Sequence, residues 1–160
     1  MSRIIVFDVN ETLLDLGVLD ELFERHLGNA ALRPLWFTQV INTAITATTI
    51  GAPYRHFGEV GAAALKMIAA RNDVTLSDEA LTEIPGRMLS LPPHPDVPGG
   101  IQRLRDAGFQ IVALTNSPLA AARAQLEAGR LIDLFDDVIS VEAVGVFKPD
   151  TRVYQMAPPS

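Results

Sequence analysis

Three short apolar stretches, separated from one another by helical sequence, constrain the fold of this chain most. They cover residues 4–7, 109–114 and 137–140. The first is a continuous apolar run, which is typical of a strand buried on both faces, as in a parallel sheet, and the second is expected to be another buried strand. Because predicted helices lie between the strands, the order of elements predicts an α/β fold with a Rossmann-like parallel sheet.

Between the first two strands, residues 16–91 are helical in pattern throughout. Helices are predicted up to a stop at Gly28, over 32–50, over 54–70, and from an N-cap at Ser77 to before residue 91. The chain is therefore expected to divide into a helical domain at 16–91, inserted into a discontinuous core made of residues 1–15 and 92–160.

The second half of the chain predicts a linker followed by strand–helix units. Residues 91–100 hold four prolines and two glycines, which predicts an irregular linker. A helix is expected over 101–107. A second helix is expected from an N-cap at Ser117, with Pro118 in its first turn, to residue 129, and a third over 151–156.

The composition excludes several classes of protein. There is no Cys, which excludes disulfides, thiolate metal sites and a cysteine nucleophile. A net charge of −6 argues against a nucleic-acid binder. No apolar run approaches the roughly 18–20 residues of a membrane span. The three histidines show no spacing for a metal site. These observations predict a cytoplasmic protein without a Cys or His metal site.

Polar residues follow each predicted strand, where ligands bind in open α/β sheets. Asp8 follows the first strand, Thr115 and Asn116 follow the second, and Lys148 comes after the third. The second group also opens a predicted helix, whose free N–H groups favour an anion. A carboxylate, a hydroxyl and amide pair, and an ammonium group are therefore expected to meet at one edge of the sheet.

These residues, in this order, resemble the three first motifs of the haloacid dehalogenase superfamily. The matching segments are residues 7–15, 113–117 and 147–150, and the helical insert at 16–91 resembles the superfamily's cap. The resemblance implies that Asp8 is a nucleophile and that Thr12, four residues later, supports it. It also implies that Lys148 pairs with the nucleophile, and that Thr115 and Asn116 position Asp8 or the substrate.

Asn10 indicates which branch of the superfamily is closest. Phosphatases of the superfamily usually have a second Asp here, which protonates the leaving alkoxide, and Asn cannot supply that proton. A halide leaves without a proton, so a carboxylate can displace it and form an ester that water cleaves. The spacing of Lys148 and Tyr154, six residues apart, is similar to that of the Lys and Tyr in the 2-haloacid dehalogenase subfamily. This resemblance implies hydrolytic dehalogenation of a small 2-haloacid without a cofactor, with Asn10 and Tyr154 at the substrate.

The chain departs from that subfamily in the helical insert. Trp36 aligns with a Trp that precedes an Arg in the subfamily, and that Arg is proposed to take the substrate carboxylate or the departing halide. Phe37 stands in its place. Phe37 and Phe57 are predicted to pack against the substrate, although helical spacing also fits a role in the helical core. Arg33 and Arg55 are alternative anion binders, but no spacing supports either.

A second departure concerns the fourth motif of the superfamily, which cannot be assigned. Doubly wound sheets commonly have about five or six strands, whereas three are recognised here. The core is therefore expected to be incomplete at the C-terminus, either as part of a longer protein or with a partner chain completing the sheet. Relatives often form dimers, so the resemblance also implies that a homodimer can form.

Two other functions remain open at this point. The first is a phosphatase of the same superfamily, which would use Mg²⁺ to release phosphate from a small ester. The second is a non-catalytic protein or fragment that keeps the fold without turnover. The residues at the strand ends also have purely structural interpretations, because Thr12 fits a helix N-cap and residues 115–117 fit a loop.

Overall fold

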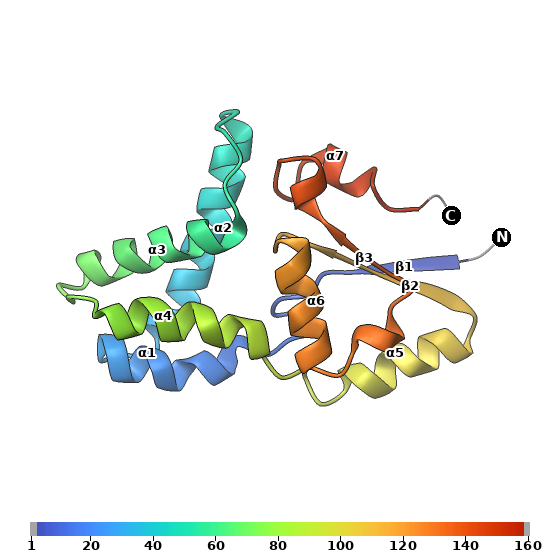
Figure 1. Cartoon of the computed structure of the whole chain (residues 1–160), viewed down its shortest axis with the longest axis horizontal. Helices are drawn as coiled ribbons and strands as arrows, with labels where there is room; N and C mark the ends of the chain where they lie inside the picture. The colour runs from blue at the N-terminus through green and yellow to red at the C-terminus, as the bar shows by residue number, and fades with distance from the viewer. Residues whose placement is uncertain (1–2, 159–160) are drawn as a thin grey trace.

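The computed structural model describes residues 3–158 as a parallel sheet joined to a group of helices (Figure 1). Residues 1, 2, 159 and 160 of the predicted core segments lie outside the described residues. The strands are β1 (Arg3–Phe7), β2 (Phe109–Thr115) and β3 (Asp137–Ser140). The helices are α1 (Asp20–Leu27), α2 (Leu32–Thr49), α3 (Phe57–Arg71), α4 (Asp78–Arg87), α5 (Val97–Asp106), α6 (Leu119–Ala128) and α7 (Thr151–Tyr154). Short 3₁₀ helices are η1 (Leu16–Leu19), η2 (Met88–Ser90), η3 (Ile132–Leu134) and η4 (Val141–Ala143).

The three described strands form one sheet in the order β1-β2-β3, and both pairs of neighbours are parallel. This confirms the predicted α/β class. The prediction that the first strand is buried on both faces is wrong, because Val6 is 41% exposed. Within the described residues β1 pairs with β2 alone and forms an edge of the sheet. The central strand β2 is buried from Ile111 to its end.

The four helices α1–α4 gather at one end of the molecule, away from the sheet (Figure 1). Helix α2 packs against α3, and α1 packs against α4. Two predicted ends are confirmed: Gly28 follows α1 with a φ of 72°, and the Ser77 hydroxyl accepts a hydrogen bond from the Ala80 N–H at 3.1 Å. The predicted start of the third helix at residue 54 is wrong, because α3 begins at Phe57. No described helix is long and apolar enough to span a membrane.

Several predicted boundaries on the sheet side are wrong. Helix α5 begins at Val97 and not at 101, because Pro98 in the first turn needs no hydrogen-bond partner for its nitrogen. The irregular linker is therefore limited to residues 91–96. Ser117 does not cap α6; Pro118 occupies that position, and the Leu119 N–H donates to Glu142 at 3.1 Å. Helix α7 ends at Tyr154 and not at 156.

Two segments connect the helical end to the sheet, and they are hydrogen-bonded to each other. The Asp15 N–H donates to the Pro92 carbonyl at 2.8 Å, and the His94 N–H donates to the Leu13 carbonyl at 3.0 Å. Leu14, between these bonds, is fully buried. This pairing fixes where α1–α4 stand relative to the end of β1.

The central strand should dominate the stability of the sheet. Ile111 is fully buried, whereas Gln110 on the same strand is exposed. We expect Ile111→Ala to lower the free energy of unfolding by about 2–5 kcal/mol, because a cavity replaces packed methyl groups. Gln110→Ala should change it by less than about 0.5 kcal/mol. Urea titrations measure both values, and equal effects would contradict the assignment of β2 as the core strand.

Candidate active site

The carboxyl ends of the strands bring the polar residues into one place. Asp8 directly follows β1, Thr115 is the last residue of β2, and Asn116 comes next. The parallel register pairs Phe7 with Ala113, so these ends lie side by side. Lys148 arrives from the loop between η4 and α7.

Asp8 is held through both of its carboxylate oxygens. The Lys148 ammonium group donates to Oδ1, and the Thr12 hydroxyl donates to Oδ2 at 3.2 Å. Lys148 also donates to the Leu114 carbonyl at 2.9 Å. The Asp8 side chain is 44% exposed, whereas that of Lys148 is 17% exposed. The arrangement is an oriented, charge-compensated carboxylate that a solute can reach.

The backbone around Lys148 is fixed by neighbouring side chains. The Asn116 side-chain oxygen accepts from the Lys148 N–H at 3.0 Å, so Asn116 positions the lysine. Asp150 caps α7 by accepting from the Arg152 N–H at 2.9 Å. The side-chain hydrogen bond from Arg152 lowers the pKa of Asp150 to about 2, so this cap is charged at neutral pH.

Thr115 and Asn10 use their polar atoms within the protein. The buried Thr115 hydroxyl oxygen accepts from the Ser117 N–H at 3.1 Å. Asn10, only 7% exposed, donates to the Ser117 hydroxyl and accepts from Gln125 Nε2, both at 3.2 Å. Gln125 Nε2 also donates to the Met88 carbonyl at 2.7 Å. The Asn10 amide therefore joins β1, α6 and η2.

A cavity of about 280 Å³ opens in front of Asp8. Its lining contains most of the residues predicted for the site, together with three that were not predicted. The lining residues are Asp8, Asn10, Phe37, Ile41, Ile45, Phe57, Thr115, Asn116, Lys148 and Pro149. Thr12 reaches the site only through Asp8. Tyr154 does not line the cavity and is half exposed on α7.

Sequence reasoning missed Ile41 and Ile45, which line the cavity from α2. A signal for them existed, because Phe37, Ile41 and Ile45 are four residues apart and share one face of a helix. Gln125 was missed without any such signal, because its contact with Asn10 joins residues 115 positions apart.

The two alternative arginines do not reach the cavity. Arg33 pairs with Asp20 and with Glu11, and Arg55 lies 3.9 Å from Glu59. Lys148 is therefore the only Lys or Arg among the lining residues. Phe37 and Phe57, which are 8% and 6% exposed, provide an apolar wall from α2 and α3.

The donor set in the cavity does not match a divalent metal. Magnesium prefers carboxylate and water oxygens in octahedral geometry. Asp8 is the one carboxylate in the lining, and Lys148 already occupies one of its oxygens. Across residues 3–158, no group of three or more His, Asp or Glu side chains could hold a metal ion.

A parallel α/β sheet with a lysine-paired aspartate at its strand ends, and helices inserted after the first strand, defines a class of hydrolases. Residues 3–157 match the family model for haloacid dehalogenase-like hydrolases, and the chain belongs to that family. This confirms the resemblance found in the motifs.

Curated and solved relatives agree with this family. The chain is 32% identical to (S)-2-haloacid dehalogenase 1 of Pseudomonas sp. (strain CBS-3), over 97% of this chain and 69% of that protein. L-2-haloacid dehalogenase from Xanthobacter autotrophicus matches with a TM-score of 0.89 and 25% identity, over 100% of this chain and 67% of that one. A structure of the Xanthobacter enzyme with chloropropionic acid covalently bound matches with a TM-score of 0.88 and 25% identity, over 98% and 63%. The chain thus spans about two thirds of the length of these relatives.

The bonds between Asn10 and Gln125 should be measurable as an energetic coupling. Both side chains are buried, and removing Gln125 leaves the Asn10 side-chain oxygen without its donor at a cost of about 1–3 kcal/mol. The effects of Asn10→Ala and Gln125→Ala on the free energy of unfolding should therefore be non-additive by about 0.5–3 kcal/mol. Urea titrations of both single variants and the double variant measure this, and strictly additive values would contradict the network.

Proposed function

We propose that this protein hydrolyses the carbon–halogen bond of a small 2-haloacid, with Asp8 as the nucleophile. The observation that carries the proposal is the accessible Asp8 carboxylate, held by Lys148 and Thr12 at the end of β1. The covalent complex of the Xanthobacter relative supports a route through a bound intermediate.

The first step forms an ester. One Asp8 carboxylate oxygen attacks C2 of the substrate, and the carbon–halogen bond breaks with its electron pair leaving on the halide. A halide is a weak base and needs no proton. This matches Asn10, whose amide has no acidic proton to give and is engaged with Ser117 and Gln125.

The second step regenerates Asp8. Water attacks the carbonyl carbon of the Asp8 ester, and the bond between that carbon and the oxygen attached to C2 breaks. The products are a 2-hydroxy acid, a proton and the free Asp8 carboxylate. Across both steps one water is consumed, and one halide ion and one proton are released for each substrate. No metal or organic cofactor takes part in the proposed sequence.

In this scheme Lys148 interacts with two negative charges, the Asp8 carboxylate and the carboxylate of the substrate. Its ammonium group compensates the Asp8 carboxylate and keeps it oriented towards the cavity. With Phe37 in place of the expected arginine, we assign the anionic end of the substrate to Lys148, with Thr115 and Asn116 beside it. These residues line the same cavity, and Lys148 is the only Lys or Arg among them.

The helices at 16–91 are proposed to act as a cap over a core of residues 1–15 and 92–160. Phe37 on α2 and Phe57 on α3 close one side of the Asp8 cavity. Their apolar rings make this side of the cavity less polar, and attraction between charges is stronger in a less polar medium. A homodimer stays a prediction.

The geometry gives less support to the alternative function, a phosphatase of the same superfamily. A superfamily phosphatase needs an acid for the leaving alkoxide, and the corresponding position here is the hydrogen-bonded amide of Asn10. Release of phosphate from a small ester only when Mg²⁺ is added would favour the phosphatase over the proposed dehalogenase.

Replacement of Asp8 tests the nucleophile. We expect Asp8→Asn to lower halide release from chloroacetate and 2-chloropropionate by about 10⁴-fold or more, because an amide cannot form the ester. Asp15→Asn is the matched control, since its side chain accepts only from the Gly17 N–H and an Asn oxygen can do the same. Halide release by ion chromatography measures both. Activity retained in the Asp8 variant, or lost equally in the control, would contradict the proposal.

A further inference from the structure

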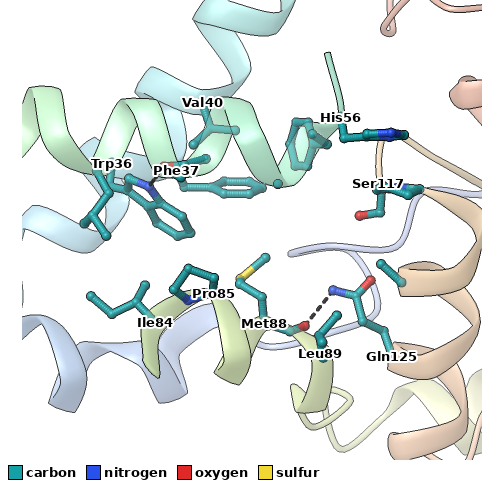
Figure 2. A pocket seen from close by; sticks show the side chains of 17 residues that line it. Trp36, Phe37, Val40, His56, Ile84, Pro85, Met88, Leu89, Ser117 and Gln125 are labelled. Atoms are coloured by element: carbon teal, nitrogen blue, oxygen red, sulfur yellow. Dashed lines mark hydrogen bonds between the residues drawn. The ribbon is translucent and has the colours of Figure 1, made fainter. Parts of the chain in front are cut away.

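A second cavity lies between the helices α2–α4 and the start of α6 (Figure 2). It has a volume of about 170 Å³ and is distinct from the cavity at Asp8. Figure 2 shows Trp36, Phe37 and Val40 on one side of it, and Pro85 and Met88 on the opposite side. It is lined mainly by apolar side chains from the helical end and from α6.

The two cavities share a wall. Phe37 and Phe57 line both of them. Asn10 lines the Asp8 cavity, and its amide bonds to Ser117 and Gln125, which line the second cavity. A group attached to a molecule at Asp8 would therefore meet the second cavity directly behind these aromatic rings and this amide.

The size and chemistry of the second cavity fit an uncharged ring. An apolar cavity of about 150 Å³ is large enough to bind benzene, and this one is slightly larger. The lining contains no carboxylate and no Lys or Arg, and its one ionisable side chain, His56, lies 3.6 Å from Glu142. The Trp36 indole N–H already donates to the Gly61 carbonyl at 2.9 Å, so Trp36 offers only its ring surface. A charged group would lose its hydration here without a partner.

One polar atom in the lining still lacks a partner. Gln125 is 2% exposed, and its side-chain oxygen makes no hydrogen bond among the described residues. The orientation of the amide is fixed, because the Met88 carbonyl can only accept and therefore requires the nitrogen on its side. A buried acceptor without a partner costs about 1–3 kcal/mol.

We infer that the second cavity binds a ring-sized, uncharged substituent on C2 of the acid substrate, and this inference rests on the proposed function. The acid group and C2 would lie at Lys148 and Asp8, while the substituent passes Phe37 and Phe57 into the second cavity. The substrate class is then an aryl-substituted or similarly bulky 2-haloacid, rather than a haloacetate. Phe37 takes part by packing against the substituent.

Trp36 provides a direct readout, because it is the only tryptophan of the chain and lines the second cavity. The probe is 3-phenylpropanoate, which carries the ring and the acid but no halogen. We expect it to shift the emission of Trp36 with saturation, and we expect propanoate to leave that emission unchanged. Saturating propanoate should raise the apparent Kd of 3-phenylpropanoate, because both acids compete for the position at Lys148.

Two substitutions on α6 form a matched pair for this titration. Ala121 lines the second cavity, and its neighbour Ala120 is exposed on the same helix. Ala121→Leu should weaken binding of 3-phenylpropanoate by about tenfold or more, because the added side chain fills the space of the ring. Ala120→Leu should bind as the unmodified protein does. Circular dichroism and the thermal midpoint confirm that both variants are folded.

Three results would overturn the inference. They are an unchanged Trp36 emission with 3-phenylpropanoate, a folded Ala121→Leu variant that binds as tightly as Ala120→Leu, and binding that propanoate does not compete with. The last result would place the ring at a site independent of the acid. Because the probe has no halogen, its binding does not depend on turnover. Absence of halide release with intact binding would contradict only the proposed reaction.

Discussion

The ion pair between Asp8 and Lys148 is the interaction on which the site depends. It joins residues 140 positions apart, one at the end of β1 and one in the loop after η4. The strand β2 lies between β1 and β3, and the Leu114 carbonyl near its end accepts a second hydrogen bond from Lys148. The ammonium group therefore links the ends of β1 and β2, and the carboxylate stays oriented only while the parallel sheet holds these ends together.

The helical end of the molecule controls what surrounds this charged pair. Phe37 and Phe57 line both the Asp8 cavity and the second cavity, so the two cavities meet at these rings. Next to these rings, the Asn10 amide accepts a hydrogen bond from Gln125, which also donates to the Met88 carbonyl in η2. Phe37 stands where the 2-haloacid dehalogenase subfamily has an arginine, and it borders a cavity with space for a larger apolar group. In the proposed function, Lys148 recognises the charge of the substrate and the aromatic rings recognise its shape.

The parts of the fold and site that could be predicted follow local rules. Asp8, Thr115 and Lys148 were placed together because strand ends meet at one edge of a parallel sheet. The exposure of β1 could not be predicted, because an apolar run does not reveal whether its strand has one neighbour or two. The early start of α5 was missed because Pro98 was read as a breaker, although a first-turn proline is tolerated. The role of Asn10 depends on long-range packing against α6, which local patterns do not encode.

The central claim is that Asp8 forms an ester with the substrate, and one turnover in ¹⁸O-labelled water tests it most directly. The enzyme is supplied in excess over 2-chloropropionate, and mass spectrometry follows the label in the product and in the peptide that contains Asp8. The ester route predicts an unlabelled 2-hydroxy acid and ¹⁸O in Asp8, because the product takes its oxygen from the carboxylate. Labelled product with an unlabelled Asp8 peptide would show that water attacks C2 directly and would contradict the account.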